Sequence, residues 1–504
     1  MTNATFQAID PTTGSNFGSP ITEMGKSEVE ALINSAAAQK QSLAKTSPVE
    51  RAALLRNIAA SVEARREQLI EVTMKETALP NGRLTGELSR TVFQLEQFAK
   101  LVESGNHLQA IIDLPDANWI PAARPDIRKA NQSLGLAAIF AASNFPYAFS
   151  VIGGDSASAI AAGCPIIVKA HPSHPNTCKI IHEAVVEGFK KSGLSANAFV
   201  MAEGLNPEIT HWIANHPEVT AIGFTGSGMV GKLLLDISHK RTTPIPVYAE
   251  MGSLNPVFFT PGALKSNSEA LAKAALDSAT LGSGQFCTKP GIMVIPNSPE
   301  GDEFLKHVEA YLATLQVAPL LNKGIADRYS SATAKLSVDS KLKVYKGKNT
   351  DSGFGVEPTV FVVDWEVAKS NHELLEEHFG PTSVIIKTEF ANFEKVAGAM
   401  EGQLCAALHS VEGESVGALL DVLAQKAGRV IMNGFPTAVA VTAAMQHGGP
   451  WPSASTHSTS VGTDAIFRFM RPVSYQGFSE ALLPPTLQLE NPWKIEQIVN
   501  GVRN

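Results

Sequence analysis

From residue 134 onward, short apolar runs alternate with helical segments, and this alternation is the strongest constraint on the fold. The helices that join parallel strands cover both faces of the sheet, so the strands themselves are apolar. The pattern predicts strands over residues 134–141, 164–170, 198–202, 219–224 and 246–249, with helices over 148–163, 177–191, 207–215 and 229–239. Such sheets bind ligands beyond the carboxyl ends of their strands, so functional side chains are expected at that edge.

A second alternation follows, which predicts a second α/β domain. It places a helix over 304–314, a charged turn over 373–380, and strands over 353–363, 381–387, 405–409 and 428–436, the last ending in a turn. Before the first sheet, apolar residues at helical spacing predict helices over 51–76 and 86–104, with Ser27 capping an earlier one. Three prolines interrupt residues 106–133, which are therefore expected to form a hairpin arm rather than core.

Charge and cysteine content exclude several classes of protein. The formal net charge of −7 and pI near 6.0 argue against binding nucleic acid, which requires a basic surface. No apolar run reaches membrane-spanning length, and the N-terminal residues do not read as a secretory signal. The four cysteines are widely spaced, without a Cys-x-x-Cys pair, which favours a reduced cytoplasmic protein.

One cysteine lies in a setting that suits chemistry. A predicted helix over 269–281 is followed by glycines, then Cys287, then Pro290-Gly291. Glycines reduce the bulk around a thiol and let backbone approach a ligand. Accessibility is what a nucleophilic cysteine needs, although buried inert thiols are commoner. Cys164, Cys178 and Cys405 border apolar strands or lie in a helix, so they are expected to be structural.

Four further segments, read in order with this loop, carry a resemblance to a known family. They are Asn144-Phe145-Pro146, Lys169, Phe224-Thr225-Gly226-Ser227 and Glu250-Met251-Gly252, followed by Gly284-Gln285-Phe286-Cys287. As an ordered set over nearly the whole chain, these motifs resemble the aldehyde dehydrogenase superfamily. The resemblance implies an α/β protein with a Rossmann-like cofactor domain (1–113 and 134–251), a catalytic domain (252–450), and a small β oligomerisation arm with a C-terminal tail (114–133 and 451–504). It also implies a homodimer, or a tetramer built from two dimers.

The resemblance assigns catalytic roles to four residues. Cys287 is expected to add to the aldehyde, giving a thiohemiacetal that loses hydride and becomes a thioester. Asn144 and the backbone N–H of Cys287 would hold the oxyanion, and Glu250 would activate water. A rival interpretation exists, because residues 226–231 fit G-x-G-x-x-G and Glu250 follows at the distance of a ribose-binding acid. The family match favours the general base, and Lys169 as a contact to cofactor ribose.

NADP or NAD is the expected cofactor. The resemblance implies contacts from residues at strand ends and in the loops beyond them: Ala142, Ser143, Lys169, His171, Ser173, Gly226, Ser227, Gly231, Glu250, Met251, Gly252, Glu377 and Phe379. Pro172 stands where NAD-using relatives often carry an acid, which slightly favours NADP. No metal pattern is found; His171 and His174 are interpreted as solvated loop residues.

The expected substrate is a small aldehyde. Residues 124–128, 142–150, 433–437 and 447–452 resemble the α-ketoglutaric semialdehyde (2,5-dioxopentanoate) dehydrogenases and their fatty-aldehyde relatives. The product would then be 2-oxoglutarate. An apolar funnel of Phe145, Phe149, Phe286 and Phe435 would suit medium- or long-chain or aromatic aldehydes instead, and no cation for a substrate carboxylate is evident. A CoA-acylating enzyme is disfavoured by Glu250, and an inactive scaffold by the combined site residues.

Overall fold

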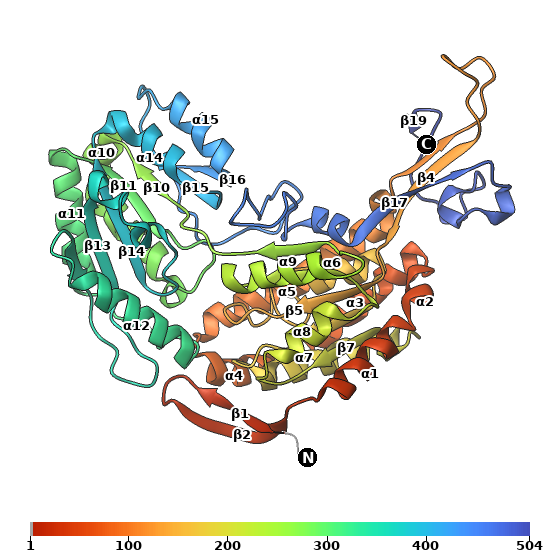
Figure 1. Ribbon diagram of the computed structural model, residues 1–504, viewed down its shortest axis with the longest axis horizontal. Coiled ribbons are helices and arrows are strands. Elements are labelled where there is room, and N and C mark those ends of the chain that lie inside the picture. Colours follow the sequence, from red (N-terminus) through yellow and green to blue (C-terminus); the bar gives the residue numbers. More distant parts are fainter. Residues whose placement is uncertain (1–3, 504) are drawn as a thin grey trace.

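The computed structural model describes residues 4–503 and shows two α/β units with a projecting arm (Figure 1). The first unit holds a five-stranded sheet in the order β7-β6-β5-β8-β9, with every neighbouring pair parallel. Its strands are β5 (Leu136–Phe140), β6 (Ile166–Lys169), β7 (Phe199–Ala202), β8 (Val219–Thr225) and β9 (Val247–Glu250). The predicted parallel sheet is therefore confirmed.

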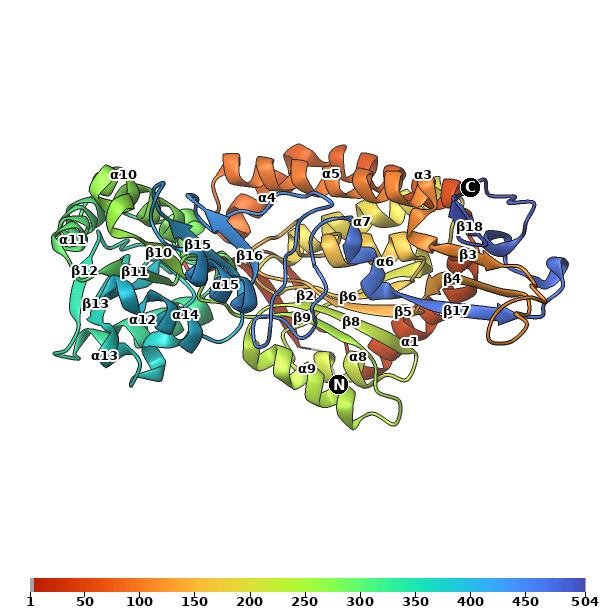
Figure 2. The same ribbon diagram turned by 90° about the horizontal axis from the view of Figure 1, so that it is seen from above.

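Helices cover both faces of this sheet, as Figure 2 shows. Alternate residues of β5 point to opposite faces, because side chains alternate along a strand. Ala137 and Ile139 join the core under one group of helices: α3 (Pro48–Glu63), α4 (Arg66–Thr77), α5 (Asn81–Ser104), α6 (Gly154–Ala162) and α7 (Pro175–Lys191). Leu136, Ala138 and Phe140 join the other, under α1 (Lys26–Ala37), α8 (Glu208–Asn215) and α9 (Gly228–Lys240). Burial of the strands on both sides explains their unbroken apolar sequence.

Some predicted boundaries are wrong. The helix N-cap is Gly25 rather than Ser27, because the backbone N–H of Gly25 donates to the Glu28 carboxylate at 2.7 Å. The predicted helix over 51–76 is two helices, α3 and α4. The helix expected from residue 148 begins only at α6, since Ala148 O accepts from Gly154 N at 2.9 Å and closes a tight turn. At Gly153 in this turn a Cβ would lie 2.4 Å from Ala148 O, so the turn needs glycine.

The second unit is built on a seven-stranded sheet in the order β12-β13-β14-β11-β10-β15-β16, parallel except for β12 against β13. The strands are β10 (Val257–Phe259), β11 (Ile292–Pro296), β12 (Lys343–Lys346), β13 (Thr359–Asp364), β14 (Thr382–Thr388), β15 (Gln403–His409) and β16 (Ala427–Met432). Its main helices are α10 (Pro261–Thr280), α11 (Pro299–Leu312), α12 (Lys323–Ser337), α14 (Phe393–Ala399) and α15 (Gly417–Lys426). The strand predicted over 353–363 starts only at Thr359, after a turn. The helix predicted from residue 269 begins earlier, at Pro261, with a kink at Asn267.

The arm is a five-stranded sheet in the order β17-β4-β3-β18-β19. Its strands are β3 (Ala110–Asp113), β4 (Ile127–Ser133), β17 (Met470–Gln476), β18 (Gln497–Val499) and β19 (Val502–Arg503). Strand β3 pairs with β4, so this sheet begins before residue 114. The helical piece expected at 465–469 is the 3-10 turn η6 (Thr463–Phe469). Two smaller elements complete the N-terminal region, the hairpin of β1 (Thr5–Asp10) and β2 (Ser15–Thr22) and the short helix α2 (Lys40–Ala44).

The segment after β16 returns to the first sheet and lies along β9. Glu250 forms a bridge with Ala454, and Met251 N donates to Ser453 O at 2.8 Å. This return carries residues 433–462 past the carboxyl ends of the strands, between the two α/β units. No helix within residues 4–503 is long and apolar enough to cross a membrane.

Candidate active site

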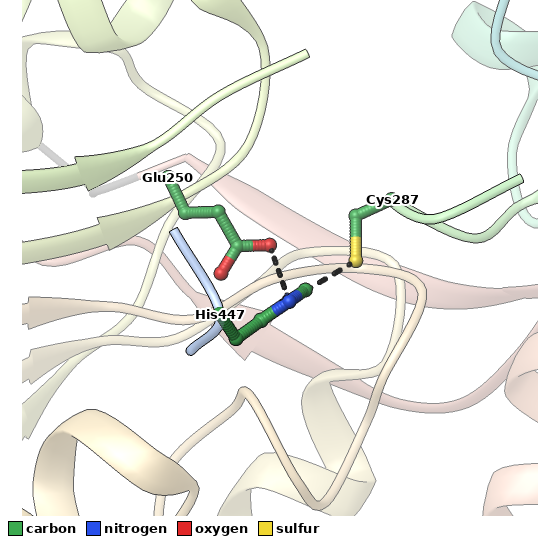
Figure 3. A group of neighbouring side chains, drawn as sticks. All are labelled: Glu250, Cys287 and His447. Atoms are coloured by element: carbon green, nitrogen blue, oxygen red, sulfur yellow. Dashed lines mark hydrogen bonds and ion pairs between the residues drawn. The ribbon is translucent and has the colours of Figure 1, made fainter. Parts of the chain in front are cut away.

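Three chain segments meet where the two α/β units face each other. Glu250 ends β9, Cys287 lies on the loop after α10, and His447 lies on the returning segment (Figure 3). His447 Nε2 lies 3.6 Å from Cys287 Sγ and 3.0 Å from Glu250 Oε1. The same ring nitrogen lies near both the thiol and the carboxylate, so the neutral imidazole can accept the thiol proton only when that nitrogen carries no hydrogen of its own.

Glu250 is held as a buried, ionised carboxylate. Burial raises its pKa, but His447, the Ser460 hydroxyl and Cys287 outweigh that effect, and the pKa is lowered overall. Ser460 Oγ donates to Glu250 Oε2 at 2.7 Å. A carboxylate kept ionised in this way can accept a proton from water or from an imidazolium.

The Cys287 thiol is half-buried and has a pKa well above its ordinary value. Burial is the main cause, and the negative charge of Glu250 adds to it. The resting side chain is therefore a protonated thiol at neutral pH. Because only the thiolate is a good nucleophile, the reaction needs a proton acceptor, and His447 is in place to serve.

Strained backbone and buried hydrogen bonds fix the loop that carries the thiol. Gly284 has φ +69°, and a Cβ there would lie 2.2 Å from Gly380 O, so only glycine fits. Ser283 also has a positive φ of 57°. Asn255 Nδ2 donates to Cys287 O at 2.8 Å and to Lys289 O at 2.9 Å. These contacts hold the nucleophile in a single position, as precise chemistry requires.

Asn144 reaches the same loop from the end of β5. Its Nδ2 donates to Gln285 O at 2.9 Å, two residues before Cys287. An amide group has two N–H donors, so one remains for an oxyanion formed at the thiol. The structure thus brings Asn144, Glu250 and Cys287 together, as the motifs predicted.

Lys169 ends β6, and its ammonium group is fixed by backbone. Lys169 Nζ donates to Ala170 O and to Gly204 O, each at 2.8 Å. Burial lowers the pKa of Lys169 to about 8. This side chain lies at the carboxyl edge of the sheet, away from the thiol, where a cofactor contact was predicted.

The glycine-rich turn between β8 and α9 is packed directly against Glu250. Gly226 N donates to Glu250 O at 3.0 Å. A Cβ at Gly231 would lie 2.5 Å from Met251 Sδ, so glycine permits close contact of α9 with the end of β9. Ser227 caps α9 through its hydroxyl. The N-terminus of α9, which can bind an anion through its free N–H groups, therefore lies next to Glu250.

Glu377 approaches the same edge from the second unit. A Cβ at Gly252 would lie 2.5 Å from Glu377 Oε2, so Gly252 makes room for this carboxylate. Burial raises the pKa of Glu377 to about 7, against the attraction of Lys289. Phe379 is partly buried beside it. Both residues lie where the resemblance placed cofactor contacts.

The loop after β6 differs from its predicted solvated state. His174 is fully buried; its Nε2 lies 3.0 Å from Ala142 O and its Nδ1 lies 3.2 Å from Cys178 Sγ. The interpretation of His174 as a solvated residue is wrong, because this side chain ties α7 to the end of β5. His171 is half-buried and stacks on it at 5.5 Å. Ser173 Oγ accepts from Asn322 of the second unit at 3.0 Å, and Ser143 lies in the turn after Ala142.

Three of the four predicted funnel residues gather beside the thiol. The ring centroid of Phe145 lies 5.4 Å from that of Phe149 and 5.0 Å from that of Phe286. Phe435 does not join them; its ring lies 4.7 Å from the His409 ring at a tilted angle, and it packs against the core of the second unit. The aromatic cluster of Phe145, Phe149 and Phe286 is therefore a three-residue wall next to Cys287.

The sequence interpretation missed His447. The residue opens His447-Gly448-Gly449-Pro450-Trp451-Pro452, a segment that carried the resemblance without an assigned role. Its ring, with the atoms of Cys287 and Glu250, forms a group of possible metal donors within 4.8 Å of one another. A metal bound there would occupy the thiol that must attack. The absence of a metal cofactor stays a prediction.

The parallel sheet and the site at its carboxyl edge are those of an enzyme with a dinucleotide-type domain. The sequence pattern that defines the aldehyde dehydrogenase family matches residues 1–473 of this chain. The chain belongs to the aldehyde dehydrogenase family. This confirms the predicted resemblance, the predicted fold and the prediction of an oxidoreductase that acts on small aldehydes.

Two curated relatives are similar over most of the chain. The chain is 39% identical over 503 residues to α-ketoglutaric semialdehyde dehydrogenase 2 of Azospirillum brasilense, covering 99% of this chain and 96% of that protein. It is 39% identical over 467 residues to α-ketoglutaric semialdehyde dehydrogenase of Acinetobacter baylyi, with 91% and 88% covered. Among solved structures, glyceraldehyde-3-phosphate dehydrogenase of Methanocaldococcus jannaschii complexed with NADP matches with a TM-score of 0.80 at 20% identity, covering 94% of this chain and 99% of that one.

Proposed function

We propose that this enzyme oxidises α-ketoglutaric semialdehyde (2,5-dioxopentanoate) to 2-oxoglutarate with NADP or NAD. The juxtaposition of Cys287, His447 and Glu250 carries the aldehyde oxidation, and identity of 39% to two dehydrogenases of this semialdehyde supports the substrate. The alternative, a medium- or long-chain or aromatic aldehyde, is supported by the aromatic cluster of Phe145, Phe149 and Phe286.

The proposed reaction uses the chain's own groups in sequence. His447 takes the proton of Cys287, whose sulfur adds to the aldehyde carbon, while Asn144 and the backbone N–H of Cys287 hold the oxyanion. Loss of hydride from this adduct leaves a thioester on Cys287. Glu250 then takes a proton from the water that cleaves the thioester, and the acid leaves. The need for a base that activates water counts against transfer to CoA.

The carboxyl edge of the first sheet fits a nicotinamide dinucleotide. Lys169, the N-terminus of α9 and Glu377 offer a cation, backbone donors and a ribose acceptor along one edge. The open space at Gly228, where a Cβ would meet nothing within 4 Å, leaves the helix end accessible. The cofactor, when bound, accepts the hydride. The cofactor domain and catalytic domain remain part of this proposal, with the arm sheet beginning at β3 rather than at residue 114.

The enzyme is proposed to assemble into oligomers through its arm and to reside in the cytoplasm. Within residues 4–503, the edge strands β17 and β19 of the arm each pair with one strand only, so the arm is suited to pair with another copy, as unpaired edges invite pairing. A homodimer, or a tetramer of two dimers, is expected. Four free cysteines, with no disulfide among the described residues, fit the reducing cytoplasm.

The first test measures reduction of NAD and NADP with 2,5-dioxopentanoate and with a medium-chain aldehyde such as octanal. We expect the oxo-acid to have the higher kcat/KM, and NADP to be used at least as well as NAD because Pro172 does not repel its 2′-phosphate. A higher kcat/KM for octanal would reject the proposed substrate and support the alternative. Analysis of the products with and without CoA distinguishes hydrolysis to the free acid from transfer of the acyl group to CoA.

Replacing Glu250 with Gln separates the two half-reactions. We expect hydrolysis of the thioester to slow by about 10²-fold or more, in the range of lost general-base catalysis, with a smaller effect on its formation. Rapid mixing should then show a burst of reduced cofactor, followed by slow turnover. Glu218→Gln, which removes an exposed acid paired with Lys40, is the control. An equal loss in both phases would contradict the water-activating role.

A further inference from the structure

The aromatic cluster has a cationic wall contributed by α5. Arg83, Glu87 and Arg90 lie on one face of this helix, because residues three and four apart are neighbours. Arg83 Cζ lies 4.4 Å from the ring centroid of Phe145 and 5.1 Å from that of Phe286. Arg90 Cζ lies 5.2 Å from the ring centroid of Phe149. The aromatic cluster beside the thiol is therefore bordered by two guanidinium groups.

Arg83 already has a partner within the protein. Its guanidinium pairs with the buried carboxylate of Glu87. The other oxygen of Glu87 accepts from Tyr147 N at 2.8 Å and from Ala148 N at 2.9 Å. Both carboxylate oxygens of Glu87 are therefore bonded, one to Arg83 and the other to the turn that follows Asn144. The negative charge of Glu87 also acts on Arg90 and favours the charged guanidinium.

Of the two arginines that border the aromatic cluster, Arg90 makes no hydrogen bond to a carboxylate within residues 4–503. Its Nε and Nη1 atoms are buried and make no hydrogen bond to any residue of the described chain, 4–503. One turn further along α5, Gln94 Nε2 is likewise buried without an acceptor within that range. Buried charges and donors are normally satisfied, so donors left open at a ligand site indicate a ligand that supplies the acceptor.

Arg90 is linked to the proposed catalytic residues through a short series of contacts. Phe149, which Arg90 contacts, lies 6.1 Å from the His447 ring, and His447 contacts the Cys287 thiol. Burial lowers the pKa of Arg90, and the charge of Glu87 opposes this effect more strongly than the charge of Glu250, which also acts on the guanidinium.

We propose that Arg90 binds the carboxylate of an oxo-acid aldehyde whose carbonyl lies at Cys287. This inference rests on the proposed function and identifies the residue that would select its substrate. The planar guanidinium can donate two parallel hydrogen bonds to a carboxylate, and a partly desolvated site strengthens them. The aromatic cluster packs against the methylene groups between the two ends.

Replacing Arg90 with Gln tests this assignment, with 2,5-dioxopentanoate and pentanal as two five-carbon substrates. We expect kcat/KM for the oxo-acid to fall about 10- to 100-fold, mainly through KM, as a charge-assisted hydrogen bond is lost. Pentanal, which has no carboxylate, should change less than about 3-fold or improve. Arg90→Lys should recover part of the loss, and Lys100→Gln, an exposed charge on the same helix, should have no effect.

A second readout does not depend on turnover. The oxo-acid product, 2-oxoglutarate, should protect Cys287 of the wild-type protein from alkylation by iodoacetamide, and protect Arg90→Gln much less. An Arg90→Gln enzyme that keeps its preference for the oxo-acid would overturn the inference and leave the proposed function intact. Equal losses with both substrates would also overturn it. A wild-type enzyme without that preference would instead reject the proposed substrate, before any variant is made.

Discussion

Replacing Cys287 with Ala should abolish aldehyde oxidation, with a loss of at least about 10⁴-fold in kcat, because removing a covalent nucleophile has effects of this size. The proposed cofactor-binding edge is built from β6, β8, β9 and α9, and Cys287 lies on a loop outside these elements. Binding of NADP, followed by fluorescence titration, should therefore be unchanged. Absorbance of the reduced cofactor measures turnover.

The matched control is Cys164→Ala. Cys164 is fully buried, and its thiol contacts Phe469 O at 3.4 Å, far along the chain from the site. Its loss should lower stability slightly and leave kcat intact. Cys287→Ala turnover above about one per cent of the wild-type rate would reject the covalent mechanism, since general positioning effects leave far less.

Strands could be predicted from the sequence more accurately than helix starts or side-chain positions. Parallel strands buried on both sides have unbroken apolar sequences, so β5 to β9 were predictable. Helix starts were harder to predict, because caps depend on individual hydrogen bonds such as that between Gly25 and Glu28. Phe435 was grouped with the other phenylalanines by residue type, whereas the turn after β16 directs it toward His409.

The candidate active site was predictable only in part, because some of its residues are brought in by tertiary contacts. Asn144, Glu250 and Cys287 lie in short motifs that carry a family resemblance. The role of His447 depends on the return of the chain along β9, where Met251 N bonds to Ser453 O. Arg90 lies in no recognisable sequence motif. Its proposed role rests on guanidinium N–H groups without a hydrogen bond in the described chain, and on the hydrogen bonds that Glu87 makes to other residues. Tertiary contacts of this kind have no local sequence signature.

Replacing His447 with Gln should lower the rate of thioester formation by between about 10²- and 10⁴-fold at neutral pH, the usual range for a lost general base. The reason is the raised pKa of the Cys287 thiol, which burial and Glu250 keep protonated. Glutamine can still donate a hydrogen bond to Glu250, but it cannot accept the thiol proton. Single-turnover measurements of cofactor reduction between pH 6 and 10 would isolate this step.

The pH dependence distinguishes proton acceptance from mere positioning. Without His447, attack depends on thiolate that forms by loss of a proton to solvent, and this fraction grows tenfold per pH unit below the thiol pKa. The defect of His447→Gln should therefore shrink as pH rises. A defect of constant size at every pH would mean that His447 only orients Glu250 or Cys287. His457→Gln, which changes an exposed histidine of the same segment, should follow the wild-type profile throughout.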